Sequence, residues 1–291
     1  MNFIAAPGKQ ISLIAVLLTC SVLSACDVYD NIKRAMGKAE PVFETVPPQL
    51  PAFLPDQPRI LNFSKTNGFR HGEAIEAANA SLDTIAKAQG WQVFHTENGA
   101  VFNDDQLAQF DVIFANNCTG DNWNDEQKAA FQRYMENGGG FVGIHGAAGT
   151  RFDFWGWYKQ DLLKGQFVGH PMFPQFQVAT VHFENRKHPA SRHFPEHWEH
   201  EDEWYSFSNN PREDGASVIA TLDETTYEPK AMGTDLSMGD HPIIWSHCMS
   251  GGGRVFFSAL GHAAETYQRP EHQSMLTGAL RWSMGLEGQC Q

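Results

Sequence analysis

The most informative stretch of the chain reads Gly138-Gly139-Gly140-Phe141-Val142-Gly143-Ile144-His145-Gly146-Ala147-Ala148. Three glycines follow a helix-like segment, and a short apolar run then ends in a histidine that is followed by Gly146. This pattern predicts a strand that enters a tight elbow, because glycines admit strained dihedral angles and close backbone packing. In such an elbow the middle residue, here His145, stands above the sheet edge and is exposed for chemistry. A buried strand with a flexible exit is the alternative.

Strand-like and helix-like segments alternate on the N-terminal side of this stretch. We expect strands at 60–64, 91–95, 110–115 and 140–144, and helices at 73–89, 104–109 and 124–136. Gly90 is placed to close the first helix, and Asn124 with Gln127 resembles a capping box. This alternation predicts an α/β fold, a doubly wound and mostly parallel sheet with helices on both faces.

The C-terminal half is less regular and richer in aromatic residues. Further strands are expected at 175–183, 217–221, 243–247 and 253–259, followed by a helix at 275–284. The run from Glu196 to Glu203 carries histidines and carboxylates at near-helical spacing, for which we expect a solvated acidic face. The chain has no internal repeat and no second linker, so a single domain is expected over residues 59–286.

Polar side chains follow several of the expected strands. His71 comes after the first strand, Asn116 and Asn117 after the third, His145 after the fourth and His262 after the last. Ligands of open α/β sheets bind beyond the carboxyl ends of the strands, so these residues should meet at one edge. Histidine transfers protons near neutral pH and binds metals through its neutral ring. A structural hydrogen bond is the alternative role for each histidine.

The N-terminus resembles an export signal. Lys9 precedes an apolar run, residues 11–23, which is too short for an ordinary membrane-spanning helix and suits a signal peptide over residues 1–25. The sequence Leu23-Ser24-Ala25-Cys26 resembles a bacterial lipobox, which implies cleavage before Cys26 and acylation of its thiol. We therefore expect an exported protein, lipid-anchored to a bacterial membrane and facing the periplasm. A secretory signal without lipidation is the alternative.

Residues 26–58 lack sustained periodicity and are rich in proline. Proline removes backbone donors and favours extended conformations, so this segment is interpreted as a tether. We expect the domain to begin at Arg59 and to fold without the tether. The prolines are Pro41, Pro47, Pro48, Pro51, Pro55 and Pro58.

The net charge limits the binding partners of the protein, and the cysteine count limits its disulfides. The formal net charge of −13 argues against nucleic acid, because an acidic surface repels a phosphate backbone. Beyond the signal and Cys26, the cysteines are Cys118, Cys248 and Cys290. An odd count permits at most one disulfide among them, and the sequence does not choose the pair. It predicts no oligomeric state either.

Five motifs in order resemble the trehalose-utilisation (ThuA-like) family. The resemblance covers roughly residues 59–286 and implies a fold similar to class I glutamine amidotransferases, with a role in the metabolism of disaccharides or their keto derivatives. The motifs are Phe63-Ser64-Lys65-Thr66-Asn67-Gly68-Phe69-Arg70-His71, Gly139-Gly140-Phe141-Val142-Gly143-Ile144-His145, Phe167-Val168-Gly169-His170-Pro171, Asp202-Glu203-Trp204-Tyr205 and Gly253-Arg254-Val255-Phe256-Phe257-Ser258-Ala259-Leu260-Gly261-His262.

The elbow departs from that of the amidotransferases. Their elbow carries a nucleophilic cysteine, whereas this chain has His145 there, and Cys118 follows a different strand. Glutamine hydrolysis through a thioester is therefore not expected. The aromatic motif adds Glu203, a carboxylate that could pair with the histidines for acid/base chemistry.

Together these observations predict a sugar site. The expected catalytic residues are His71, His145, Glu203 and His262. The expected substrate-binding residues are Asn116, Asn117, His170, Trp155, Trp204 and Tyr205, whose aromatic members could stack on sugar rings or pack in the core. No cofactor is certain, although histidines with Glu203 could bind a divalent metal ion.

Two classes of function follow. One is an enzyme that hydrolyses, eliminates or isomerises a disaccharide or keto-sugar glycoside. The other is a non-catalytic sugar-binding lipoprotein. In both, the partners are a small sugar and, through the lipid anchor alone, a membrane.

Overall fold

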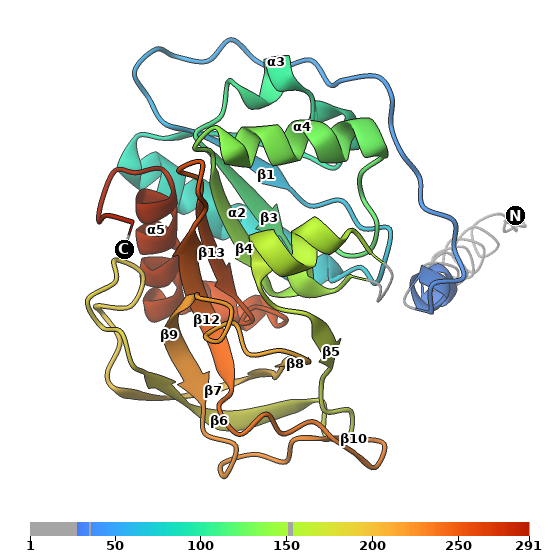
Figure 1. Cartoon of the computed structure of the whole chain (residues 1–291), viewed down its shortest axis with the longest axis vertical. Helices are drawn as coiled ribbons and strands as arrows, with labels where there is room; N and C mark the ends of the chain where they lie inside the picture. Colours follow the sequence, from blue (N-terminus) through green and yellow to red (C-terminus); the bar gives the residue numbers. More distant parts are fainter. Residues whose placement is uncertain (1–27, 35, 151–153, 291) are drawn as a thin grey trace, which may run out of the picture.

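The computed structural model describes residues 28–34, 36–150 and 154–290, and its centre is a nine-stranded sheet (Figure 1). One half of the sheet is parallel. Its strands, in spatial order, are β2 (Gln92–Thr96), β1 (Arg59–Phe63), β3 (Val112–Asn116), β4 (Gly140–Ile144) and β13 (Arg254–Ser258). Every residue of β3 and β4 is buried, as expected for strands covered on both faces.

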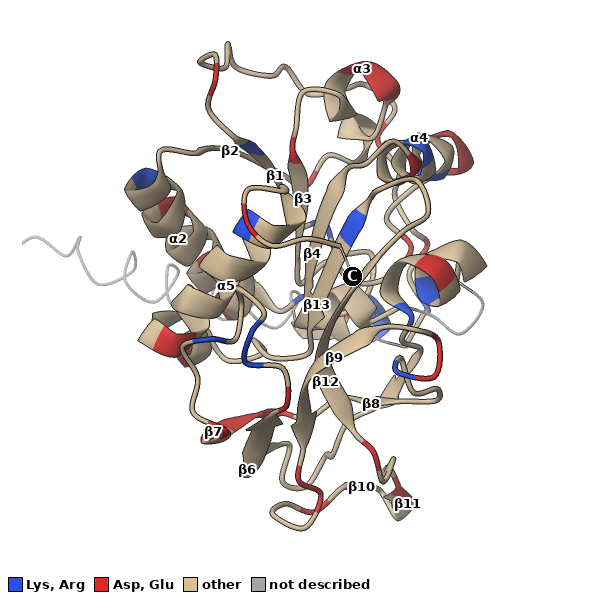
Figure 2. Ribbon diagram, turned by 60° about the vertical axis from the view of Figure 1, so that its left-hand side comes forward, with Lys and Arg blue, Asp and Glu red and all other residues tan. Residues whose placement is uncertain are grey.

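Helices cover both faces of the parallel half. Figure 2 shows α2 (Gly72–Gln89) and α5 (Pro270–Ser283) on one side of these strands and α4 (Asp125–Glu136) on the other, with α3 (Asp104–Leu107) packed beside α4. Gly90 closes α2 at φ 71°, and Asn124 and Gln127 form the reciprocal capping box. The predicted α/β fold is confirmed.

The other half of the sheet is antiparallel. It continues from β13 through β12 (Pro242–Cys248), β9 (Ser217–Leu222), β6 (Phe176–Phe183) and β7 (His197–Glu203). Two small sheets pair β5 (Phe167–Gly169) with β8 (Ser206–Phe207), and β10 (Lys230–Ala231) with β11 (Thr234–Asp235). Short helical turns lie at Gly99–Val101, His145–Ala148, Tyr158–Leu163 and Ala264–Gln268.

Strand β7 differs from the solvated acidic face expected for residues 196–203. Its side chains alternate, so that Glu199 and Glu201 are exposed while Trp198, His200 and Asp202 are buried. The buried positions of β7 are mostly polar. The alternation of buried and exposed side chains therefore does not appear as an alternation of apolar and polar residues in the sequence.

Residues 36–58 run along the domain rather than away from it. Glu44 pairs with Lys65, which is 5% exposed, and accepts a hydrogen bond from the Gly99 amide at 2.8 Å. The Gln106 side chain donates to the Pro48 carbonyl at 2.7 Å. Residues 39–58 form no helix or strand, and several of their backbone groups form hydrogen bonds with the domain.

The proposed signal and Cys26 lie outside the described residues. Within the part that the structure describes, no helix combines the length and apolar character needed to cross a membrane. A disulfide joins Cys248, at the end of β12, to Cys290 in the C-terminal tail, while Cys118 is free and buried. This pairing resolves the choice that the sequence left open.

Candidate functional site

The elbow after β4 has the strained backbone that its glycines predict. His145 has φ 41°, in the left-handed region that non-glycine residues rarely adopt. At Gly146 a Cβ atom would lie 3.0 Å from the Asn117 carbonyl oxygen, so a larger residue would crowd the turn. The His145 side chain is nevertheless fully buried. It therefore lies beneath the site rather than exposed above the sheet edge.

Three histidines and one carboxylate meet beyond the ends of β1, β4 and β13. One ligand atom from each of His71, His145, Glu203 and His262 lies within 4.8 Å of the others. His145 Nε2 is 3.2 Å from His262 Nδ1 and 3.3 Å from Glu203 Oε2, and the last two atoms are 3.0 Å apart. The structure thus brings together the four residues predicted to be catalytic. We call them the His–Glu cluster.

Hydrogen bonding fixes the tautomer of His145. Its Nδ1 donates to the Ala259 carbonyl oxygen at 2.7 Å, because that oxygen can only accept. In a neutral ring Nε2 then carries a lone pair, and it faces the Glu203 carboxylate oxygen. His262 Nδ1 lies 3.2 Å from this nitrogen and 3.0 Å from this oxygen, so either its N–H or a cation satisfies both acceptors.

The His–Glu cluster has the donor set of a divalent metal site. Nitrogen and oxygen ligands bound to zinc at ~2.0–2.1 Å are separated by about 3.3 Å in a tetrahedron, close to the spacing of His145, His262 and Glu203. A ligating histidine commonly donates its second ring N–H to a backbone carbonyl, as His145 does to Ala259. His71 Nδ1 is buried and has no partner within the described residues. These residues therefore fit a divalent ion.

Within the cluster, Glu203 contacts both His145 and His262. Burial alone would raise its pKa, but hydrogen bonds and charges from His145 and His262 outweigh burial and hold the pKa well below its usual range. Its second oxygen, Oε1, is 3.0 Å from His170 Nδ1 and accepts a hydrogen bond from Gln175. The carboxylate is thereby fixed on both sides.

Asp202 supports the cluster from below. Its Oδ1 accepts from the amides of Glu203 and His262 at 2.9 and 3.1 Å, and its Oδ2 accepts from Gly261 at 2.8 Å. Burial would raise the pKa of Asp202, but His200, His145 and the Gly261 amide lower it overall. This residue was not predicted, although it neighbours Glu203 in the aromatic motif.

A cavity of about 500 Å³ opens above the cluster. Its polar lining includes His71, His170, Gln175, Glu203 and His262. Burial, followed by repulsion from His145 and His262, lowers the pKa of His71 well below its ordinary value. Flat rings also line the cavity, those of Phe69, Phe167 and Tyr205.

The other predicted substrate-binding residues lie elsewhere. Trp204 is buried and donates to the Gln177 carbonyl at 2.8 Å, and Trp155 packs against the hydrophobic core. Asn116 and Asn117 are fully buried; Asn117 donates to the Tyr267 hydroxyl at 2.8 Å and accepts from the Gly146 amide at 3.3 Å. None of these four is among the described residues that line the cavity. The asparagines instead hold the elbow and its surroundings.

Three side chains that line the cavity are not among the predicted site residues. Gln175 follows a loop, Phe69 is one aromatic residue among many, and Arg34 lies in the segment interpreted as a tether. Only the Phe63–His71 motif as a whole could have indicated Phe69.

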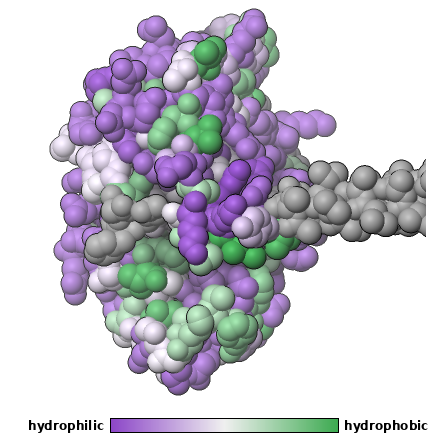
Figure 3. All heavy atoms as spheres, turned by 90° about the vertical axis from the view of Figure 1, so that its right-hand side faces the viewer, coloured by the Kyte–Doolittle hydropathy of each residue, from purple (hydrophilic) through white to green (hydrophobic). Residues whose placement is uncertain are grey.

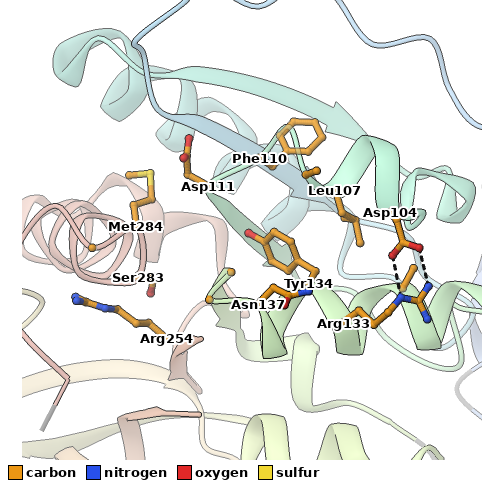
Figure 4. A pocket seen from close by; sticks show the side chains of 15 residues that line it. Asp104, Leu107, Phe110, Asp111, Arg133, Tyr134, Asn137, Arg254, Ser283 and Met284 are labelled. Atoms are coloured by element: carbon orange, nitrogen blue, oxygen red, sulfur yellow. Dashed lines mark hydrogen bonds and ion pairs between the residues drawn. The ribbon is translucent and has the colours of Figure 1, made fainter. Parts of the chain in front are cut away.

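A larger cavity, of about 650 Å³, lies at the opposite end of the parallel strands (Figure 4). There Arg133 and Asp104 form an ion pair at 2.9 Å, and the Tyr134 hydroxyl donates to the Gly140 carbonyl at 3.3 Å. These polar groups neutralise or bond one another. The smaller cavity is therefore the better candidate, because it lies at the carboxyl ends of the strands and contains the His–Glu cluster.

Cys118 and a surface group of two histidines and a glutamate lie outside the His–Glu cluster. Cys118 is buried, and burial raises the pKa of its thiol to about 12, so it is no nucleophile near neutral pH. His182, Glu196 and His197 gather on the surface of β6 and β7, where all three are solvent-accessible.

Comparisons with known proteins agree with the fold and with the motifs. The crystal structure of a thua-like protein from Bacteroides uniformis is similar to this chain, with 26% sequence identity and a TM-score of 0.67 over 81% of this chain and 95% of that one. A thua-like protein from Parabacteroides merdae shares the fold at 18% identity and a TM-score of 0.59, covering 81% and 93%. A search of curated proteins finds no match. The family model described as ThuA, trehalose utilisation, matches residues 59–283, and the chain therefore belongs to the ThuA family.

Proposed function

We propose that this protein is an enzyme that acts on a disaccharide or keto-sugar glycoside by acid/base chemistry at the His–Glu cluster. Membership of the ThuA family associates the chain with sugar utilisation. The observation that carries the proposal is the convergence of three histidines and a carboxylate on one cavity. Hydrolysis, elimination and isomerisation of sugars all need a proton removed at one position and delivered at another.

The positions of the side chains suggest their roles. His71, Glu203 and His262 reach the cavity, so one of them would accept a proton from water or from the carbon beside a carbonyl. Another histidine of the cluster would protonate the departing oxygen. His145 lies beneath them and holds Glu203 and His262 in place. The exposed ring of Phe69 offers a flat face to a sugar.

The proposal includes a divalent metal ion as an option for the same site. Such an ion would polarise a carbonyl oxygen or lower the pKa of a bound water. The four residues of the His–Glu cluster would then be its ligands, and His170 with Gln175 would orient the Glu203 carboxylate.

Turnover of a keto-disaccharide by three variants tests the proposal. His262→Ala should lower the rate ~10²–10⁴-fold, because an acid or base at the cavity is lost. His145→Ala should also lower the rate, because Glu203 and His262 lose the side chain that holds them in place. His182→Ala on the surface of β6 is the matched control and should retain the wild-type rate. Elemental analysis of the purified protein should show about one divalent ion per chain in the wild type and a loss in His145→Ala if the cluster holds metal.

Two results would redirect the proposal. Wild-type turnover in both cluster variants would exclude the His–Glu cluster as the reaction site. Sugar binding without any turnover in the wild type would favour the non-catalytic sugar-binding protein.

A further inference from the structure

The segment interpreted as a tether contributes a side chain to the cavity. Residues 28–34 form a short helix at the right edge of the view in Figure 1. Asn31 attaches this helix to the loop after β1, since its side chain accepts from the Arg70 amide at 2.6 Å and donates to the Arg70 carbonyl at 3.1 Å. Arg34, one turn later, lines the cavity above the His–Glu cluster.

Among the described residues, the Arg34 guanidinium has one hydrogen-bond partner. One nitrogen donates to the Thr66 carbonyl at 3.1 Å, which uses one of five N–H donors and fixes the direction of the side chain. No ion pair with a described acidic residue is formed. Asp121, which lines the small neighbouring cavity together with Arg34, is paired with Lys128 at 3.2 Å.

The charge of the cavity contrasts with that of the protein. The chain carries a formal net charge of −13, yet among the described lining residues Glu203 is the one acid and Arg34 the one lysine or arginine. Glu203 is already bonded to His145, His262, His170 and Gln175. Arg34 forms no ion pair with a described carboxylate, so its charge is not neutralised within the described part of the cavity. A guanidinium at the mouth of a cavity attracts an anion toward an otherwise acidic surface.

We propose that Arg34 forms an anion-binding subsite at the mouth of the cavity, and that the substrate is a sugar bearing a carboxylate or phosphate group. The planar guanidinium presents paired donors that match either group. The inference rests on the proposed function for the presence of a sugar, and it adds the chemical class of that sugar. It also makes the N-terminal segment part of the site. Figure 3 shows the face of the molecule that lies on the right in Figure 1, where hydrophilic residues predominate in the upper part and hydrophobic residues gather in the lower part.

Direct binding measurements in the full-length chain test the subsite. The probes are glucose, glucuronate, glucose 6-phosphate and inorganic phosphate, each titrated by calorimetry into the wild type, Arg34→Gln and Lys38→Gln. Lys38→Gln removes the same charge four residues away, at an exposed position that does not line the cavity. We expect at least one anionic probe to bind the wild type about tenfold more tightly than glucose, and this preference to vanish in Arg34→Gln alone. Glucuronate and glucose 6-phosphate distinguish a carboxylate from a phosphate.

Three results would contradict the proposed subsite. The first is that the wild type binds no anionic probe, and the second is that both variants bind the anionic probes equally weakly. The third is that Arg34→Gln loses affinity for glucose and for the anions alike, which would indicate recognition of hydroxyl groups. Failure of the proposed function is separate, because His145→Ala reports on turnover whereas the calorimetry reports on binding. Thermal melting of each variant confirms that it is folded.

Discussion

Asp202 is the residue on which the geometry of the site most depends, although it does not reach the cavity. Its two oxygens accept hydrogen bonds from three backbone amides, those of Glu203, Gly261 and His262. The carboxylate therefore ties the end of β7 to the exit of β13. A charged acceptor suits this position because three donors converge on it.

Replacing Asp202 by Asn should disturb both stability and chemistry. An amide offers one acceptor oxygen, and its NH2 group would face a backbone donor, so we expect a loss of ~1–3 kcal/mol in the free energy of unfolding. As Asp202 is a positioning residue, kcat should fall more than KM rises. Glu201→Gln, on the same strand but exposed, is the control for urea unfolding and for kinetics. Equal behaviour of the two variants would show that Asp202 positions nothing.

At the scale of elements, the closing helix α5 is packed tightly enough to require a glycine. A Cβ atom at Gly278 would lie 2.2 Å from the Pro189 carbonyl oxygen, which belongs to the loop between β6 and β7. Gly72, at the start of α2, has nothing within 4 Å of the same position. A side chain at Gly278 would therefore be crowded, whereas one at Gly72 would have open space around it.

The pair Gly278→Ala and Gly72→Ala tests this packing. Alanine normally stabilises a helix relative to glycine by ~0.4–1 kcal/mol, and Gly72→Ala should show that gain or no change. Gly278→Ala should instead cost ~1–3 kcal/mol, because the backbone of the loop has to move. Chemical denaturation of both variants measures the difference. A stabilised Gly278→Ala would mean that α5 does not pack against this loop.

The elements also show what could be predicted from the sequence. Strands β1 to β4 and helices α2 to α4 were predicted within a few residues, because apolar periodicity and caps are local signals. Strand β7 was missed, since its buried positions include His200 and Asp202. Trp204 could not be told from a cavity residue, because an aromatic side chain looks the same in a core and in a pocket.

At the scale of the whole molecule, the site is assembled from parts far apart in the chain. The parallel half contributes His71, His145 and His262 at strand exits, and their convergence could be predicted because such exits share one edge. Glu203 comes from the antiparallel half, where only a family motif pointed to it. Arg34 comes from the N-terminal segment, whose proline content predicts extended chain but not its path.

An ion pair attaches the extended segment, residues 36–58, to the domain. Lys65 is buried, and its partner Glu44 lies in the extended segment. Burial would raise the pKa of Glu44, but the hydrogen bonds from Lys65 and from the Gly99 amide outweigh burial and lower that pKa. Glu44→Ala leaves a buried ammonium unpaired, so we expect a loss of ~1–3 kcal/mol, reduced from the value for a fully buried pair because Glu44 is partly exposed.

Urea unfolding of Glu44→Ala in the full chain measures this effect. Glu40→Ala is the control, because Glu40 lies in the same segment and is exposed. A lowered midpoint in Glu44→Ala alone would show that residues 36–58 are bound to the domain and help to stabilise it. Removing residues 28–58 should then cost at least as much and should also abolish the anion preference that Arg34 provides. Equal midpoints for both variants would instead favour the detached tether expected from the sequence.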